Sequence, residues 1–514
     1  MKKHFFIKLL TFFTVICLSV NFFACTANNG TNVPQTSNEP EKIDVTSVTL
    51  NKTEMELLED EAFTLSATVL PENADDKSLV WKSSDESCAI VSEGVVLAVS
   101  EGVAEITATS KNGIVAKCTV TVKVDKEPYT FSKFHITTNN GKAITSKDDY
   151  VKCTVSVTNA SKKYCFENLT GKIKGRGNST WDMPKKPYKL KFDEKIDLFG
   201  NGSSKTWTII ANYADPSLIR NHLAYVLADC FDTLESTTKL HTVDLYVNGK
   251  YDGVYLICEQ NETGKNRVDI SEELDVLDTG YLIELDARAA TEGELGTHYF
   301  SVASYFHVIK GPDVEDENFT PEHFEFIKNY VITSYNLLLN LADFDQVCEY
   351  IDVETFADAY IIHEIMGSVD VGYSSFYMHK DAGGKLKAGP LWDFDISSGN
   401  CNYQPNAINT EYLWARDNLW YKKLLKYDEF KALVAQKLNT FDYQKIIDDE
   451  IAEILLYEDA YEKNFERWNI LGKYVWPNSN KVASIKTWKG QVEYVQQWLT
   501  QKLNYIKTVY TVSE

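Results

Sequence analysis

Three aspartates in the second half of the chain have the types and spacing that could do chemistry. Asp370 precedes a short aromatic run, and Asp393 and Asp395 follow an aliphatic run that begins after the turn at residues 381–384. The turn holds Asp, Ala and two Gly, which suit a tight connection, so the segment predicts a β-hairpin. A hairpin brings Asp370 beside Asp393, and strand parity points Asp395 the same way as Asp393.

Clustered carboxylates repel one another unless a positive group lies between them. A divalent cation with hard oxygen ligands, Mg²⁺ or Mn²⁺, suits this role, and Mg²⁺ is commonly completed by waters and substrate phosphates. The alternative is that each aspartate only caps a turn by accepting local backbone hydrogen bonds. The three together favour a metal site.

A second candidate region is the glycine-rich segment 171–181, which contains Arg176 and is followed by a lysine-rich strand at 184–192. Alternation in this strand predicts that Lys186 shares an inward face with aromatic and aliphatic residues. An inward lysine needs an anion, such as a nucleotide phosphate or the carboxylate of Glu259 at the end of the strand at 253–258. The alternative is a lysine at a strand end that reaches solvent.

The elements that position these residues follow from hydrophobic periodicity. A helix over 353–369, capped by Asp352, leads directly to Asp370, and the helix expected at 217–231 has Ser217 as its N-cap. Further strands are expected at 242–247, 253–258 and 280–286, and helices from about residue 419 onward. His363 and Glu364 suggest a zinc protease, but Gly367 stands where the second histidine should be, which excludes that motif.

The N-terminal 24 residues carry three lysines and then an apolar run too short for an ordinary membrane anchor, which predicts a signal peptide. Cys25 follows Ala24, and we expect it to be lipidated as in bacterial lipoproteins; cleavage and release is the alternative. Residues 26–43 are polar and predict a flexible tether. The chain is therefore expected to be exported and held by a lipid anchor at the bacterial cell surface or the outer face of a membrane.

The net charge and the cysteine spacing argue against nucleic-acid-binding proteins and against cysteine-based metal or redox sites. The net charge is −22, and loss of the lysine-bearing signal makes the mature chain more acidic still, which argues against nucleic acid as a partner. The ten cysteines are widely spaced and none form a Cys-x-x-Cys pair, so a zinc ribbon or thioredoxin-type site is excluded. Cys88 and Cys118 could pair, which the sequence leaves open.

Short alternating strands between residues 44 and 124, with a turn at Asn112 and Gly113, predict a small β-sandwich. The segments Trp81-Lys-Ser-Ser-Asp and Gly102-Val-Ala-Glu-Ile-Thr-Ala resemble the bacterial Ig-like domains of group 2. The resemblance implies a spacer, with adhesion to glycans or proteins as the alternative.

Five motifs follow one another between residues 129 and 510: Lys174-Gly-Arg-Gly-Asn-Ser-Thr-Trp, Pro184-Lys-Lys-Pro-Tyr-Lys-Leu-Lys-Phe, Gly253-Val-Tyr-Leu-Ile-Cys-Glu-Gln, Ser368-Val-Asp and Gly389-Pro-Leu-Trp-Asp-Phe-Asp. In type and order these motifs give residues 129–510 a resemblance to the CotH kinase family. It implies an atypical secretory protein kinase with a two-lobed α+β fold, a helical C-terminal part, and binding of ATP and Mg²⁺. An all-β Ig-like sandwich would precede this domain.

The resemblance implies that Asp370 is the catalytic aspartate and that Asp393 binds the metal. Ser375 stands where a kinase has its metal-binding Asn, and Asp395 replaces the Gly of Asp-Phe-Gly; we infer that Asp395 supplies the missing ligand. Arg176, Lys186 and Glu259 are then the candidate nucleotide-binding residues. The expected function is transfer of the ATP γ-phosphate to Ser or Thr hydroxyls of an unknown surface or secreted protein.

Two alternatives come from other classes. A surface adhesion or structural lipoprotein without turnover would agree with the export signal and the Ig-like spacer. A carbohydrate-active enzyme needs only paired acids and leaves Lys186 and the Gly-Arg-Gly segment unexplained.

Overall fold

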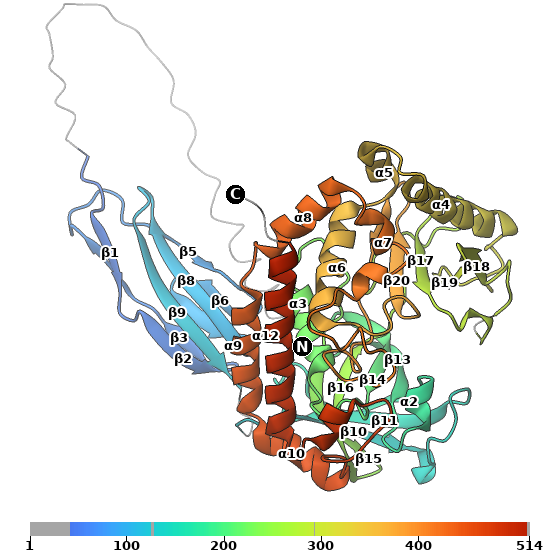
Figure 1. Ribbon diagram of the computed structural model, residues 1–514. Coiled ribbons are helices and arrows are strands. Elements are labelled where there is room, and N and C mark those ends of the chain that lie inside the picture. Colours follow the sequence, from blue (N-terminus) through green and yellow to red (C-terminus); the bar gives the residue numbers. More distant parts are fainter. Residues whose placement is uncertain (1–41, 125–127, 292, 511–514) are drawn as a thin grey trace, which may run out of the picture.

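The computed structural model describes residues 42–124, 128–291 and 293–510 (Figure 1). The expected signal peptide, Cys25 and nearly all of the expected tether lie outside the described residues. None of the helices in the described ranges combines the length and the apolar character that crossing a membrane requires.

The N-terminal domain is built from short antiparallel strands and one parallel pair, which form two sheets and a separate strand pair. The sheets have the orders β2-β9-β8-β5 and β3-β7-β6, and β1 pairs with β4. Alternate residues of β8 point inward, as predicted, and Gly113 has the positive φ that the turn after β8 needs. Cys88 and Cys118 are both buried and both free. The strands are β1 (Ser47–Leu50), β2 (Glu54–Leu58), β3 (Ala62–Thr64), β4 (Ala67–Leu70), β5 (Leu79–Ser83), β6 (Ala89–Ser92), β7 (Val95–Ala98), β8 (Gly102–Ser110) and β9 (Val115–Lys123).

A closed barrel follows, with the strand order β10-β11-β12-β13-β14-β16-β15. Its neighbours are antiparallel except for the parallel pair β10 and β15, which closes it. Inward residues such as Leu190, Trp207 and Ile257 fill the interior, because strand alternation gives each strand an apolar face. The strands are β10 (Ser132–Thr138), β11 (Val151–Thr158), β12 (Phe166–Gly175), β13 (Tyr188–Asp197), β14 (Ser203–Ile210), β15 (His241–Val247) and β16 (Lys250–Glu259).

A second sheet has the order β18-β19-β17-β20-β21. Its last two strands form the predicted hairpin, in which Met378 pairs with Ala388 and Lys380 with Leu386. The strands are β17 (Tyr281–Leu285), β18 (Tyr299–Val302), β19 (Tyr305–Gly311), β20 (Phe376–Lys380) and β21 (Leu386–Ala388).

Helix α6 lies in the interior of the helical region, packed against α3, α8, α12 and β21, while α10 packs against β16 of the barrel (Figure 1). The side chain of Asp352 caps α6 by accepting from the Thr355 amide (3.3 Å). The helices are α2 (Ser179–Asp182), α3 (Arg220–Ala228), α4 (Pro321–Leu339), α5 (Phe344–Tyr350), α6 (Val353–Met366), α7 (Tyr421–Leu424), α8 (Asp428–Leu438), α9 (Tyr443–Leu455), α10 (Glu458–Arg467), α11 (Asn480–Ser484) and α12 (Trp488–Val509). Short 3-10 turns occur at Asn139–Gly141, Ala289–Thr291 and Ala415–Asp417.

The structure differs from the sequence prediction at the start of α3. Ser217 is not its N-cap, because the helix begins at Arg220 and the Ser217 hydroxyl instead donates to Asp215 (2.5 Å).

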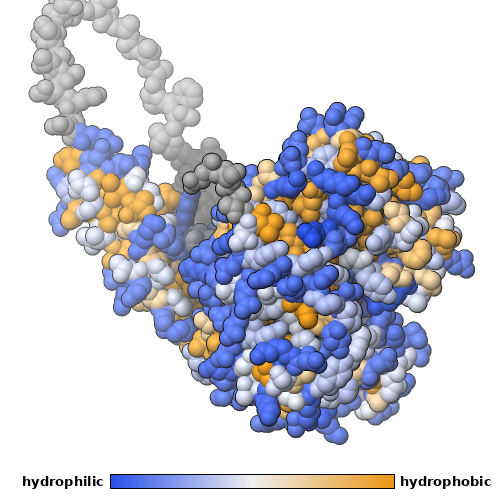
Figure 2. Space-filling model, viewed as in Figure 1, coloured by the Kyte–Doolittle hydropathy of each residue, from blue (hydrophilic) through white to orange (hydrophobic). Residues whose placement is uncertain are grey.

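Apolar side chains of α3, α4, α6, α12 and the second sheet form one continuous core. Hydrophilic residues cover much of the visible face of this region, and apolar residues are visible on the N-terminal domain and at the upper right, near α4 and α5 (Figure 2). The N-terminal part is thus a β-rich Ig-like region and the remainder an α+β region with helices.

Candidate active site

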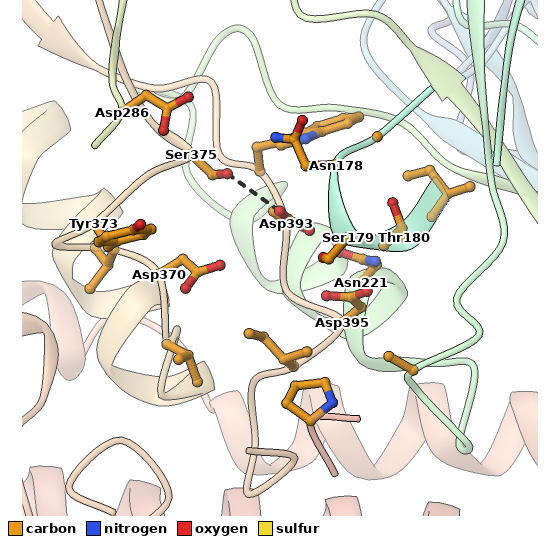
Figure 3. Close-up of a pocket in the computed structure, with 18 of the residues that line it drawn as sticks. Asn178, Ser179, Thr180, Asn221, Asp286, Asp370, Tyr373, Ser375, Asp393 and Asp395 are labelled. Carbon is orange, nitrogen blue, oxygen red and sulfur yellow. Dashed lines mark hydrogen bonds between the residues drawn. The ribbon is translucent and has the colours of Figure 1, made fainter. Parts of the chain in front are cut away.

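A cavity of about 850 Å³ lies where the barrel, the second sheet and the C-terminal segments meet. Asp370, Asp393, Asp395 and Arg176 all line it, so the structure brings together four of the residues singled out from the sequence. Figure 3 shows Asp370 with Tyr373 on one side of the cavity and Asp393 across from them. Lys186 and Glu259 do not line this cavity.

Asp370 lies in a tight turn just after α6. The helix ends at Gly367, which adopts the left-handed conformation (φ 59°) usual for a helix C-cap. The Asp370 carbonyl then accepts from the amides of Tyr373 (2.7 Å) and Ser374 (2.9 Å), which fixes the turn. Burial, and secondly the charge of Asp393, raise the pKa of Asp370 to about 6, so the carboxylate is poised to accept a proton near neutral pH.

Asp393 and Asp395 lie in an irregular segment after β21. The parity argument was wrong, because β21 ends at Ala388 and Asp393 itself adopts a left-handed conformation (φ 69°). Both carboxylates nevertheless reach the cavity. The hydroxyl of Ser375 donates to Asp393 Oδ2 (3.3 Å), as drawn in Figure 3, and Asn221 Oδ1 accepts from the Phe394 amide (2.8 Å).

Burial raises the pKa of both acids. For Asp395 the charges of Asp393, Asp215 and Asp370 raise it further, whereas Arg176 opposes the rise at Asp393. A site that forces carboxylates together in this way stores repulsion that a bound cation relieves.

A buried ion pair holds the segment after Asp395 in place. Arg220 at the start of α3 pairs with Asp215, and both side chains are fully buried. The same guanidinium donates to the carbonyls of Ser397 (2.9 Å) and Ser398 (3.3 Å). Charge-assisted bonds of this kind fix the backbone that carries Asp395.

A second set of hydrogen bonds joins three distant segments at Ala214, which lines the cavity. The carbonyl of Ala214 accepts from Asn400 Nδ2 (2.8 Å) and from Asn478 Nδ2 (2.6 Å), and the two asparagines also bond to each other (2.7 Å). The rings of Tyr403 and Trp476, which are close in sequence to Asn400 and Asn478, stack with centroids 6.1 Å apart. Both side chains line the cavity.

Arg176 follows β12 and leads into α2. Its guanidinium lies 5.6 Å from the ring centroid of Trp392, the residue that precedes Asp393. The glycines flanking it have no room for a side chain, since an added Cβ would lie 2.3 Å from Trp181 at Gly175 and 2.1 Å from Thr180 at Gly177. The glycine-rich segment is therefore needed for the close packing of this corner.

Lys186 does not occupy the inward position that alternation predicted for it. Strand β13 begins only at Tyr188, so alternation does not extend back to residue 186. The Lys186 ammonium instead donates to the Trp181 carbonyl (2.5 Å), and Lys185 is the buried lysine that lines the cavity. Lys185 donates to the Val254 carbonyl and to Asn464 Oδ1 (3.0 Å), and burial lowers its pKa to about 7.

Glu259 is also placed differently from the prediction. It faces a neighbouring cavity of about 460 Å³, where its carboxylate accepts from the Lys239 amide (3.1 Å), and it does not pair with Lys186. Burial raises the pKa of Glu259 to about 7.

The sequence interpretation missed a group of charged residues on and beside β17. Glu284 pairs with Lys310 (3.1 Å) and accepts from the Ser375 amide (3.2 Å), while Asp286 pairs with Arg288 (3.2 Å). All four line the cavity. The available signal was the appearance of acids inside and directly after a strand that is otherwise apolar, since buried strands carry charge only where it has a partner.

The donor set fits a hard cation bound together with phosphates. No group of three or more His, Cys, Asp or Glu side chains in the described ranges lies close enough to hold a metal ion by itself. Asp393 and Asp395 nevertheless supply two carboxylates at one cavity, and Mg²⁺ in phosphate-transferring sites is bound by one or two carboxylates, with waters and substrate phosphates completing its shell.

His363 and Glu364 have structural roles. His363 is buried against Phe394 and Phe376, and burial lowers its pKa to about 3. Glu364 pairs with the buried Lys502 (3.3 Å), so neither side chain belongs to the cavity.

Comparison with known proteins separates the two parts of the chain. Residues 44–122 match the bacterial Ig-like domain (group 2). A minor capsid protein of Enterobacteria phage T3 is 44% identical over 79 residues, which cover 15% of this chain and 18% of that protein. An alpha-L-arabinofuranosidase of Bifidobacterium longum is 42% identical over 80 residues, which cover 15% of this chain and 7% of that enzyme. The chain thus spans less than a fifth of the length of these curated relatives.

Among solved structures, domains 4–9 of the surface layer protein SbsC cover 42% of this chain and 27% of their own at 16% identity, with a TM-score of 0.15. That score is too low to say anything about the fold. The family model described as CotH kinase protein matches residues 173–506, which is well over half of the chain and includes every residue that lines the cavity. The chain therefore belongs to the CotH kinase protein family.

Proposed function

We propose that this chain is an exported, lipid-anchored protein kinase that transfers the γ-phosphate of ATP to Ser or Thr hydroxyls of surface or secreted proteins. The observation that carries the proposal is the single cavity in which the poised carboxylate of Asp370 faces the paired carboxylates of Asp393 and Asp395. The barrel and the helical region on either side of this cavity take the places of the two lobes of a kinase.

The residues divide the work of phosphoryl transfer. Asp370 accepts the proton of the acceptor hydroxyl as the hydroxyl oxygen bonds to the γ-phosphorus and ADP leaves. Asp393 and Asp395 would hold Mg²⁺, which supplies charge neutralisation on the phosphates when bound. Arg176, at the glycine-rich corner, is placed to contact phosphate oxygens, a role in which a planar guanidinium suits two oxygens at once. Phosphoryl transfer needs chiefly this positioning and charge compensation.

The test compares Asp370→Asn with Asp393→Asn. Asp393→Asn should weaken Mg-ATP binding, because removing a charged ligand leaves the phosphates uncompensated. Asp370→Asn should leave Mg-ATP affinity nearly unchanged while phosphate transfer falls roughly 10²-fold or more, the usual scale for a lost general base. Calorimetry measures the affinity, and labelled ATP measures autophosphorylation.

Wild-type protein that binds no Mg-ATP would refute the proposed function. Binding without transfer to any acceptor would favour the adhesion or structural lipoprotein, in which the kinase domain has no turnover. Equal losses of affinity in both variants would make Asp370 a metal ligand and leave the base unassigned.

The proposed location has its own test in Cys25. Cys25→Ser should release the protein from the membrane fraction, because cleavage of the only long apolar segment at the N-terminus leaves the lipid as the anchor. Fractionation of cells followed by immunoblotting gives the answer, and a variant that stays with the membrane would contradict lipidation.

A further inference from the structure

Arg288 is held at the cavity wall by one edge of its guanidinium. Asp286 Oδ1 accepts from both the backbone amide (2.9 Å) and Nε (3.2 Å) of Arg288. Asp286 is only 2% exposed, so its carboxylate has little freedom to move away from these two hydrogen bonds. The two terminal nitrogens, Nη1 and Nη2, make no hydrogen bond to any residue that the structure describes.

The backbone around Arg288 is tied to the turn that carries the candidate base. The Ala287 amide donates to the Tyr373 carbonyl (2.8 Å), and the Asp286 amide donates to the Phe306 carbonyl (3.1 Å). Figure 3 shows Asp286, Tyr373 and Asp370 along one side of the cavity, facing Asp393. The guanidinium therefore keeps a fixed position relative to Asp370.

The charge of Arg288 acts on both sides of the reaction centre. It lowers the pKa of Asp370 and that of Asp393, against the burial that raises them. The other cations at the wall are engaged differently: Lys310 pairs with Glu284, and Lys185 is bound by a carbonyl and an amide oxygen. Arg288 thus combines free donors with a position near both the base and the metal-binding carboxylate.

We propose that Arg288 contacts the phosphoryl group as it is transferred, with Nη1 and Nη2 donating to its non-bridging oxygens. This inference rests on the proposed function. A planar guanidinium matches two phosphate oxygens, and an arginine that meets the charge of the phosphoryl transition state contributes far more to the rate than to substrate affinity. Simple charge balance with Asp286 would not require a guanidinium that lines the cavity with both terminal nitrogens unbonded to the described residues.

The experiment uses the whole exported chain with Arg288→Gln. Phosphate transfer should fall about 10³-fold or more, as for lost transition-state arginines. Affinity for Mg-ADP should stay within about threefold of wild type, because the missing contact forms only during transfer. Calorimetry with Mg-ADP and aluminium fluoride, which mimics the phosphoryl group in flight, should show that the affinity gained from the fluoride in wild type is absent in the variant.

Two further variants make the result specific. Asp286→Asn keeps Arg288 but weakens the hydrogen bonds that hold its guanidinium. This variant should lose most of the increase in Mg-ADP affinity that aluminium fluoride produces in wild type. Arg467→Gln is the matched control, because Arg467 also pairs with an aspartate at 3.2 Å, Asp252, but lies outside the cavity. This control should behave as wild type in all three measurements: phosphate transfer, Mg-ADP affinity and the affinity gained from aluminium fluoride.

The inference would be overturned by an Arg288→Gln protein that keeps its transfer rate, or that keeps the gain from aluminium fluoride. Equal losses of Mg-ADP affinity and transfer would also overturn it, because Arg288 would then be an ordinary nucleotide-binding residue. These outcomes differ from failure of the proposed function, in which wild-type protein binds no Mg-ATP and the inference falls as well.

Discussion

The carboxylate of Asp370 illustrates how a single residue can be costly and useful at once. Burial and the charge of Asp393 favour its protonated form, whereas Arg288 and the Tyr403 hydroxyl, 3.5 Å from Oδ1, work against them. An aspartate with a pKa raised toward neutrality is a better proton acceptor, but ionising it in the folded chain costs free energy. The site therefore trades stability for function.

This trade predicts a pH-dependent effect of Asp370→Asn on stability in metal-free protein. The folded pKa of about 6 lies above the ordinary 3.8, so the folded chain binds the proton more tightly and wild type loses stability as pH rises from 4 through 6. The asparagine avoids this loss, so the variant should be more stable than wild type by up to about 3 kcal/mol at pH 8. The difference should shrink as pH falls through 6 toward 4.

Urea unfolding with EDTA at several pH values measures this difference. The exposed control Asp149→Asn should show no such trend. An Asp370→Asn protein that is less stable than wild type at pH 8 would mean that the carboxylate has a stabilising partner, and would contradict the raised pKa.

At the scale of elements, the cavity is held by buried polar contacts between irregular segments. The segment that carries Asp393 and Asp395 is irregular, and Arg220 of α3 and its neighbour Asn221 supply three of the hydrogen bonds that hold it. Removing one partner of a buried ion pair leaves an uncompensated charge, which costs far more than breaking an exposed pair.

Arg220→Met should therefore destabilise the protein by about 3–5 kcal/mol, because it leaves Asp215 buried and unpaired. Urea unfolding at pH 7 gives the value. Arg467→Gln, which breaks the more exposed pair with Asp252, should cost less than about 1 kcal/mol. Similar losses in the two variants would show that the buried pair does not hold the segment.

Predictions from the sequence were correct for elements in which the hydrophobic periodicity is regular. They were wrong for side chains just outside these elements, where regular secondary structure ends. The hairpin and α6 could be predicted from turn residues and apolar spacing, and with them the neighbourhood of Asp370 and Asp393. Lys186 was assigned the inward position that Lys185 holds, because alternation was extended two residues before β13 begins. Arg288 could not be identified, because its position depends on a bond between Ala287 and Tyr373, 86 residues apart in the sequence, that no local pattern encodes.

At the scale of the whole molecule, the N-terminal domain touches the barrel through a specific contact. Glu59, only 7% exposed, accepts from the Ser161 hydroxyl (2.5 Å) and from the Lys162 amide (2.7 Å). The sequence suggested a spacer joined by a short polar linker, part of which lies outside the described residues. These hydrogen bonds join the N-terminal domain to the barrel independently of the linker.

Deleting residues 44–124 should leave Mg-ATP affinity unchanged, because this domain has its own apolar core and contributes nothing to the cavity wall. Glu59→Ala should act only locally, by speeding hydrogen exchange at the Lys162 amide, whose acceptor it removes. Calorimetry and exchange mass spectrometry measure the two effects. Lost binding in a folded deletion variant would contradict independent modules, and unchanged exchange in Glu59→Ala would contradict the contact.

The bonds that join Ala214, Asn400 and Asn478 have a consequence for the order in which the site is made. These residues are synthesised far apart in time, yet the set of hydrogen bonds around Ala214, which lines the cavity, needs all three. A growing chain that ends before residue 476 has Asp370, Asp393 and Asp395, but it lacks Asn478 and the cavity-lining Trp476. If the proposed function holds, a product truncated there should transfer no phosphate although all three aspartates are present.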